Sequence, residues 1–295
     1  PTAGNEQRRQ EFEFHDDIKP LVETKPGIDE ATVREISRLK GEPDFMLRRR
    51  LMGLKNFLER PQPSFGPNLD FLDFSKFRYF TRYTDRVSKS WADVPEEIKN
   101  TFAKLGIPEQ ERKYLAGVNT QYESEAVYSS MLDEVNRKGV IFLDTDTALK
   151  KYPELFMRYF GHVIPWNDNK YAALNTAVWS GGIFIYVPKG VHLDKPLQSY
   201  FRINNALSGQ FERTLIIVDD DASLHFVEGC TAPVYSKDSL HAAVVEIFVG
   251  KRAKCRYTTI QNWSTNIVNL VTQRAVVDED GLMEWVDGNI GSRLN

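Results

Sequence analysis

The sequence holds two cysteines, and one of them lies where a thiol can react. Cys230 follows a Glu-Gly pair and precedes Thr-Ala-Pro, so glycine and proline interrupt the regular chain around it and can leave the sulfur accessible. An accessible thiolate can serve as a metal ligand, a nucleophile or a persulfide carrier. The alternative is a partly buried loop cysteine without a role, and position alone leaves both open.

Any metal role for Cys230 needs ligands from elsewhere, because a zinc ion or a metal cluster takes about four. His225 and His241 lie near Cys230 in the sequence and are weak candidates as ligands beside it. A lone histidine is more often a hydrogen-bonded core or surface residue, although imidazole is a common ligand.

Four polar or aromatic residues flank the predicted strand of Cys230: Arg202, Asn204, Gln261 and Trp263. Such residues ordinarily form polar ladders on a sheet. They can also line a path for a small anionic or sulfur-containing species, with Arg202 supplying positive charge.

Motifs for nucleotide chemistry are absent. The sequence contains no Gly-x-x-x-x-Gly-Lys-Ser/Thr loop, Gly-x-Gly-x-x-Gly turn, Gly-x-Ser-x-Gly elbow or His-Glu-x-x-His pair. The chain is therefore not itself a nucleotide hydrolase, and any dependence on ATP must come from a partner.

Composition narrows the class of protein. The chain has 295 residues, 41% hydrophobic and 27% charged, with a net charge of −3, which is typical of a globular protein that binds no nucleic acid. No apolar run approaches the roughly 18 to 20 residues that span a membrane, and no secretion signal is recognisable. We therefore expect no membrane contact. Two cysteines are too few for a disulfide framework, which favours a cytoplasmic protein.

The first half of the chain is predicted to be mainly helical. Residues 1–28 are weakly patterned and predict a loosely ordered arm. A mainly helical domain follows over residues 29–165. Its predicted helices cover residues 29–41, 45–58, 94–106, 108–138 and 145–160.

The second half, residues 166–295, repeats. Val187, Val218, Val249 and Val277 each end a predicted strand, at spacings of 31, 31 and 28 residues, and each is followed by a three-residue turn. A repeat of this length predicts stacked rungs of a parallel β-helix. The overall fold class is therefore α+β. The last rung is incomplete at Asn295, so we expect a truncated or processed chain.

The repeat separates the two cysteines. Alternation places Cys255 in an inward column, where a small buried hydrophobic side chain is expected. The inward column is Leu193, Leu224, Cys255 and Met283, and the outward column is Asp194, His225, Arg256 and Glu284. Cys230 instead aligns with polar residues of the neighbouring rungs, namely Ser199, Gln261 and Asn289.

Several strings closely resemble the SufB/SufD family of iron–sulfur cluster assembly proteins, from about Ala31 to Asn295. They include Phe-Ile-Tyr-Val-Pro at 184–188, Tyr-Phe-Arg-Ile-Asn at 200–204, Glu-Gly-Cys-Thr-Ala-Pro at 228–233 and Gln-Asn-Trp at 261–263. The last two are similar to SufB members rather than to SufD members.

The resemblance implies a scaffold, not an enzyme. It implies that Cys230 accepts persulfide sulfur from a cysteine desulfurase and its sulfur-transfer protein, and that Arg202, Asn204, Gln261 and Trp263 belong to the sulfur route. It also implies SufD and the ATPase SufC as partners and a transient iron–sulfur cluster. Whether the reductant is a reduced flavin stays open. Family members continue through further rungs and a helical domain, so the resemblance implies that this chain lacks the C-terminal part.

Two other functions stay open. One is a SufD-like structural or interaction solenoid without metal chemistry. The other is a β-helix enzyme that processes polysaccharides, against which the outward column is mixed in charge and no secretion signal is present.

Overall fold

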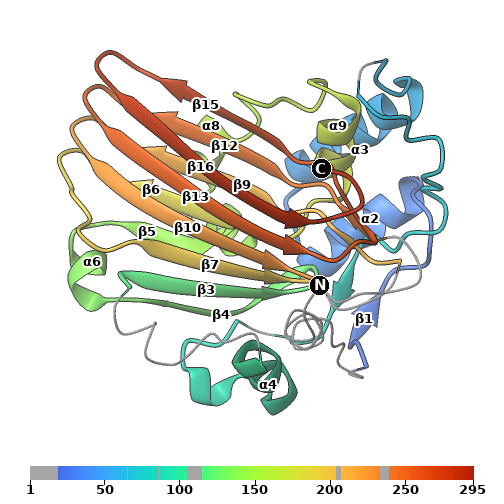
Figure 1. Ribbon diagram of the computed structural model, residues 1–295, viewed down its shortest axis with the longest axis horizontal. Coiled ribbons are helices and arrows are strands. Elements are labelled where there is room, and N and C mark those ends of the chain that lie inside the picture. The colour runs from blue at the N-terminus through green and yellow to red at the C-terminus, as the bar shows by residue number, and fades with distance from the viewer. Residues whose placement is uncertain (1–18, 65, 86, 105–114, 204–206, 233–238) are drawn as a thin grey trace, which may run out of the picture.

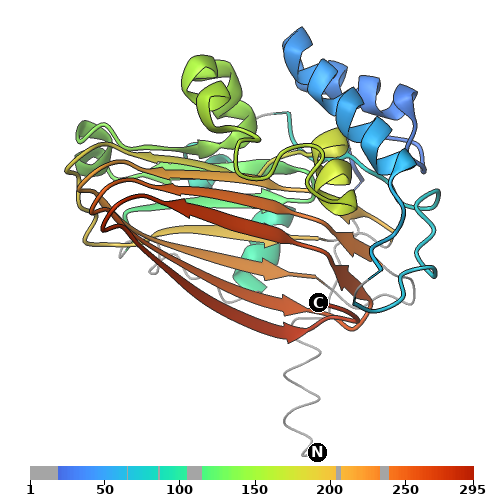
Figure 2. The same ribbon diagram turned by 90° about the horizontal axis from the view of Figure 1, so that it is seen from above.

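The structure is a computed structural model that describes residues 19–64, 66–85, 87–104, 115–203, 207–232 and 239–295. A three-sided stack of strands forms the body of the molecule, and helices lie along its outside (Figures 1 and 2). The fold class predicted from the sequence, α+β with a parallel β-helix, is confirmed.

The helices are α2 (Glu30–Lys40), α3 (Asp44–Glu59), α4 (Glu96–Lys104), α6 (Asp133–Arg137), α7 (Thr145–Lys151), α8 (Pro153–Tyr159) and α9 (Lys170–Val178). The strands before the repeats are β1 (Val22–Glu23), β2 (Thr81–Arg82), β3 (Gly117–Tyr122), β4 (Glu125–Met131) and β5 (Ile141–Asp144). Those of the repeats are β6 (Ile183–Val187), β7 (Leu197–Arg202), β8 (Gly209–Gln210), β9 (Arg213–Val218), β10 (Ser223–Thr231), β11 (Ser239–His241), β12 (Val244–Val249), β13 (Lys254–Trp263), β14 (Ile267–Asn269), β15 (Thr272–Val277) and β16 (Leu282–Gly291).

Each coil of the β-helix gives one strand to each of three sheets. The sheets have the orders β16-β13-β10-β7-β3-β4, β14-β11-β8 and β15-β12-β9-β6-β5. Val187 pairs with Val218, Val218 with Val249, and Val249 with Val277, all in parallel register. The column of valines predicted from the sequence is therefore confirmed.

The turn after each valine has the same backbone shape. Its third residue is left-handed in every coil, with φ of 71° at Gly190, 58° at Asp221, 55° at Arg252 and 55° at Asp280. The amide of the next residue donates to the carbonyl of the first turn residue, as Ala222 does to Asp219 at 3.2 Å. This repeated bend lets successive long strands begin at the same level.

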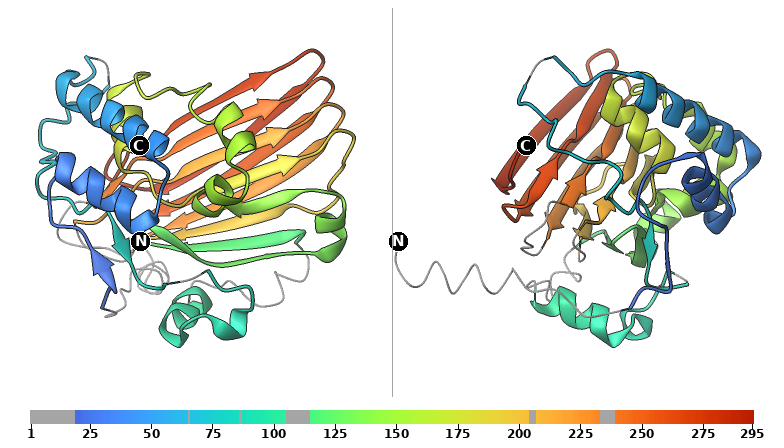
Figure 3. Two further views of the ribbon diagram at one scale, coloured as in Figure 1. Left: turned by 180° about the vertical axis from the view of Figure 1, so that it is seen from behind. Right: turned by 90° about the vertical axis from the view of Figure 1, so that its right-hand side faces the viewer.

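Inward-facing apolar side chains fill the coil, and outward-facing ones are covered by helices. Cys255, Leu224 and Phe226 belong to the interior cluster. Helices α2, α3 and α9 pack over the three-stranded sheet through residues such as Leu240, and α7 and α8 pack over the five-stranded sheet (Figure 3). Among the described residues, no helix is long and apolar enough to cross a membrane.

Several predicted elements were wrong. The helix predicted over 108–138 is instead β3, β4 and the short helix α6, while residues 105–114 lie outside the described part. Strand β3 pairs in parallel with β7, a long-range contact that local helical spacing cannot reveal. The helix predicted over 145–160 is divided at Tyr152, because Pro153 starts α8.

Helix α9 was not predicted, since the sequence after residue 170 was expected to form strands. Asn169 caps it, accepting hydrogen bonds from the amides of Tyr171 and Ala172, both at 2.9 Å. Most of the predicted arm, residues 1–18, lies outside the described residues, and Val22–Glu23 pairs with Thr81–Arg82.

Candidate functional site

Cys230 faces the interior of the β-helix and is 1% exposed. Along β10 the buried and half-buried residues alternate, which places Phe226, Glu228 and Cys230 on the inward side. The prediction that the flanking glycine and proline leave the sulfur accessible is therefore wrong. Gly229 stays within the regular strand β10.

The neighbours of Cys230 differ in part from the prediction. Gln261 lies beside Cys230 and Asn289 beside Gln261, as predicted. On the other side the neighbour is Phe201 rather than Ser199. The reason lies at the bend before β7. His192 is bridged to Ser223 and Leu197 is paired with Phe226, so this coil has two more residues between these points than the next coil, and the register of β7 shifts by two.

Glu228 is the titratable group in contact with the sulfur. The Cys230 thiol donates to Glu228 Oε1 at 3.7 Å. Burial, followed by the negative charge of Glu212, raises the pKa of Glu228 to about 7. Burial, followed by the charges of Glu228 and Glu212, raises the pKa of Cys230 well above 9.0. At neutral pH the thiol is therefore protonated beside a carboxyl that is poised to exchange a proton.

A histidine–carboxylate pair lies in the same interior. His241 Nε2 is 2.8 Å from Glu212 Oε2, and His241 Nδ1 is 2.5 Å from Asn269 Oδ1. Both members of the pair are buried, at 1% for His241 and 3% for Glu212. Burial alone would lower the pKa of His241, but the charge and hydrogen bond of Glu212 outweigh burial, so the pKa is raised above 6.5.

Gln261 and Trp263 of β13 join this group. Trp263 Nε1 donates to Gln261 Oε1 at 2.9 Å, and Asn269 Nδ2 donates to the same oxygen at 2.6 Å. The Trp263 ring also lies 4.8 Å from the His241 ring, centroid to centroid. The structure therefore links Cys230's strand neighbour, Gln261, to His241 through Asn269.

Arg202 and Asn204 are the remaining residues predicted for the sulfur route. Arg202 is fully buried at the end of β7, where it pairs with Thr231, and its Nη1 is 3.4 Å from Thr231 Oγ1. Asn204 lies outside the described residues. A role for both in sulfur transfer stays a prediction.

His225 is not part of this interior. It points outward from β10, 3.1 Å from Thr258 Oγ1, and burial followed by the charge of Arg256 lowers its pKa. No group of three or more His, Cys, Asp or Glu side chains in the described part of the chain is arranged to hold a metal ion. A metal role for Cys230, His225 and His241 therefore stays a prediction, and we assign no metal ligand.

Cys255 is 1% exposed in the interior column between Leu224 and Met283, as predicted. Burial raises its pKa to about 12. For Cys255 burial is the cause of the raised pKa, whereas for Cys230 the charges of Glu228 and Glu212 contribute as well.

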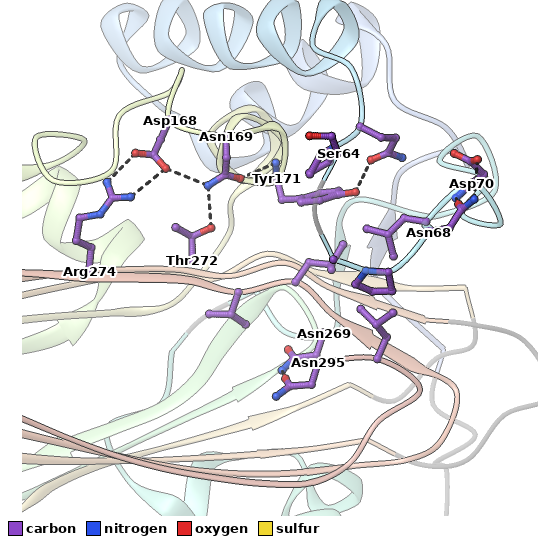
Figure 4. A pocket seen from close by; sticks show the side chains of 18 residues that line it. Ser64, Asn68, Asp70, Asp168, Asn169, Tyr171, Asn269, Thr272, Arg274 and Asn295 are labelled. Carbon is purple, nitrogen blue, oxygen red and sulfur yellow. Dashed lines mark hydrogen bonds and ion pairs between the residues drawn. The ribbon is translucent and has the colours of Figure 1, made fainter.

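A cavity of about 710 Å³ lies between the loop at 62–70, the start of α9 and strands β14 and β15 (Figure 4). Arg274 forms an ion pair with Asp168 at 2.6 Å beside it, and Asn169 donates to Thr272 at 3.1 Å. Asn269 also lines this cavity and donates to Asn295 there, so the cavity borders the interior group through one side chain.

Glu228, Glu212 and Asn269 were not predicted as site residues. Glu228 carried a usable signal, because an acidic residue stands at an inward position of an alternating strand. Glu212 and Asn269 carried none. Glu212 lies between β8 and β9, and Asn269 ends the short strand β14, whose pairing with β11 is not visible in the sequence.

Known proteins resemble this chain in sequence. Residues 201–295 match the model described as "SUF system FeS cluster assembly, SufBD core domain", and residues 86–199 match the SufBD protein N-terminal region. A protein of Staphylococcus saprophyticus described as an iron–sulfur cluster assembly SufBD family protein is 57% identical over 294 residues, covering 100% of this chain and 62% of that protein. A Staphylococcus aureus protein with the same description, from strain USA300, is 58% identical over 283 residues, covering 96% of this chain and 61% of that protein.

The chain thus spans about three-fifths of the length of these relatives. The two family models together cover the β-helix and the part before it from residue 86 onward, whereas β1, α2, α3 and β2 precede the matched regions. The chain belongs to the SufBD family of iron–sulfur cluster assembly proteins.

Proposed function

We propose that this chain is a SufB-type scaffold in which Cys230 accepts sulfur for cluster assembly. The observation that carries the proposal is the contact of the Cys230 thiol with Glu228 Oε1, 3.7 Å away in the interior of the β-helix. A buried thiol with a raised pKa reacts slowly unless a base removes its proton, and Glu228 is that base.

The proposed step is an exchange without net oxidation. The Cys230 sulfur attacks the terminal sulfur of a persulfide on the donor protein, and its proton passes to Glu228. The donor's sulfur–sulfur bond breaks, a new one forms on Cys230, and the donor leaves as a thiolate that takes up a proton. Gln261, beside Cys230 on the next coil, then faces the transferred sulfur.

Partners and cargo belong to this proposal as well. We propose SufC and SufD as partners, a cysteine desulfurase with its sulfur-transfer protein as donor, and a cytoplasmic location. The iron–sulfur cluster is the cargo rather than a resident cofactor, and the scaffold turns over no substrate of its own. A reduced flavin stays a prediction.

Anaerobic mass spectrometry tests the proposal. The full-length protein is incubated with the desulfurase, its sulfur-transfer partner and cysteine, and Cys230 is examined for added sulfur. We expect a sulfur adduct on Cys230 that is lost in Cys230→Ser. Cys255→Ser is the matched control and should keep the adduct, since Cys255 is equally buried but lies at another position of the interior.

Glu228→Gln tests the base separately. It keeps the size of the side chain and should slow loading without moving the adduct to another residue. A folded protein whose Cys230 gains no sulfur would overturn the proposal and favour a structural, SufD-like role.

A further inference from the structure

Four interior side chains form a hydrogen-bonded chain whose direction is fixed at one end. An indole N–H can only donate, so Gln261 must present its carbonyl oxygen to Trp263, at 2.9 Å. Asn269 contacts the same oxygen at 2.6 Å and must therefore donate its amide nitrogen. The remaining oxygen of Asn269 is then left to face His241.

The orientation of Asn269 decides the state of His241. Because Asn269 Oδ1 accepts, His241 Nδ1 must carry a hydrogen, across 2.5 Å. The other ring nitrogen faces Glu212 Oε2 at 2.8 Å, and one proton must lie between them for a hydrogen bond to exist. With that proton the His241–Glu212 pair is neutral, and without it the pair carries a charge of −1.

We propose that Trp263, Gln261 and Asn269 are positioning residues that fix His241 Nδ1 as a donor to Asn269 and thereby hold one proton between Nε2 and Glu212. The part of the inference that concerns sulfur loading rests on the function proposed above. The part that concerns the proton does not.

The charge of the His241–Glu212 pair changes the pKa of Glu228. Glu212 disfavours the ionised form of Glu228, whereas His241 favours it. The groups that act on Glu228 and Cys230 are Glu212, His241, Tyr257 and Asp287, together with Glu228 and Cys230 on each other. Losing the shared proton would leave the charge of Glu212 uncompensated, and Glu228 would release its own proton only at higher pH.

Nitrogen-15 NMR of the histidine side chains tests the proton directly, and the His241→Gln variant identifies the signal. We expect both ring nitrogens of His241 to stay protonated to a pH above the ordinary 6.5 of histidine. Trp263→Phe should release Gln261 and Asn269 to reorient, and His241 should then lose its proton at lower pH. Trp285→Phe is the matched control, because Trp285 lies on the next coil outside this chain of bonds.

A second pair of variants guards against misfolding of Trp263→Phe. Asn269→Asp keeps an acceptor toward His241 and should preserve the doubly protonated ring, whereas Asn269→Leu should lose it. A neutral His241 in the unaltered protein, or an unchanged His241 in folded Trp263→Phe and Asn269→Leu, would overturn the inference.

The pH profile of sulfur loading on Cys230 separates this role from a place in the sulfur route. If Trp263 acts through His241, Trp263→Phe shifts the midpoint of loading upward by on the order of one pH unit. If Trp263 only lines the route, loading falls equally at every pH, and the positioning role is overturned. Absence of loading with an intact His241 signature would refute the proposed function alone.

Discussion

Glu228 occupies a position where the fold would be more stable with an uncharged side chain. Its carboxyl is buried among Glu212, Tyr257 and Cys230, and burial raises its pKa from 4.5 to about 7. Between those two pH values the unfolded chain releases this proton and the folded chain keeps it. The folded state therefore loses stability as pH rises through this window.

Glu228→Gln should remove that loss. We expect the variant to be more stable than the unaltered protein by up to about 3 kcal/mol at pH 8, with a smaller difference at pH 5. Urea unfolding at the two pH values measures the difference. An equal difference at both would contradict the sign worked out here.

At the residue scale, Cys230 could be proposed from the sequence as the reactive residue, but its surroundings could not be predicted. Glycine and proline around Cys230 mark an unusual position, yet they suggested exposure where the sulfur is buried. Alternation along β10 places Cys230 on the same inward side as Phe226, and the two additional residues before β7 decide only which side chain of β7 lies beside it. Hydrogen bonds between strand ends, such as that of His241 with Asn269, follow from coil closure and leave no local pattern.

At the scale of elements, glycines fix where the β-helix begins. Gly182, just before β6, has φ of 88°, and a Cβ there would lie 2.5 Å from the carbonyl oxygen of Arg213. Gly190 has φ of 71° in a turn, with no atom within 4 Å of an added Cβ. Both positions are left-handed, but only the first also lacks space.

The two glycines give a matched comparison. Gly190→Ala should cost about 1 kcal/mol, the strain of a left-handed alanine. Gly182→Ala should cost several times as much, because the backbone of Arg213 cannot move aside without shifting β9. Thermal unfolding of both variants checks the order, and equal losses would show that β6 and β9 can separate at this point.

The elements show which sequence patterns are reliable. The valine period predicts the β-helix because each coil repeats the same local rule, an alternating strand followed by a left-handed turn residue. The helix predicted over residues 117–131 was wrong because β3 and β4 pair with each other, and β3 also pairs with β7. Helix α9 carries a capping Asn169 that could have been recognised.

At the scale of the whole molecule, the last coil leaves two sheet edges open among the described residues. β16 ends the six-stranded sheet and β15 ends the five-stranded one. Both strands carry exposed apolar side chains, namely Val276, Val277, Leu282, Trp285, Val286 and Ile290. Unpaired backbone groups beside apolar side chains favour pairing between molecules.

Residues 1–295 expressed alone should therefore self-associate in a concentration-dependent way. Val286→Lys places a charge on the outward side of β16 and should shift the population toward monomer, whereas Val22→Lys, on β1 of the separate two-stranded sheet, should not. Light scattering after size-exclusion chromatography measures the mass. Monomers at all concentrations would mean that the edge is protected in another way.

The contact between His241 and Trp263 gives the protein an optical reporter of its own interior. The centroids of the two rings lie 4.8 Å apart. A protonated imidazole beside an indole interacts with its π electrons, which are the source of tryptophan fluorescence. Protonation of one buried histidine should therefore dim the fluorescence of one tryptophan. The charge state of this buried site can then be followed in real time, without a label.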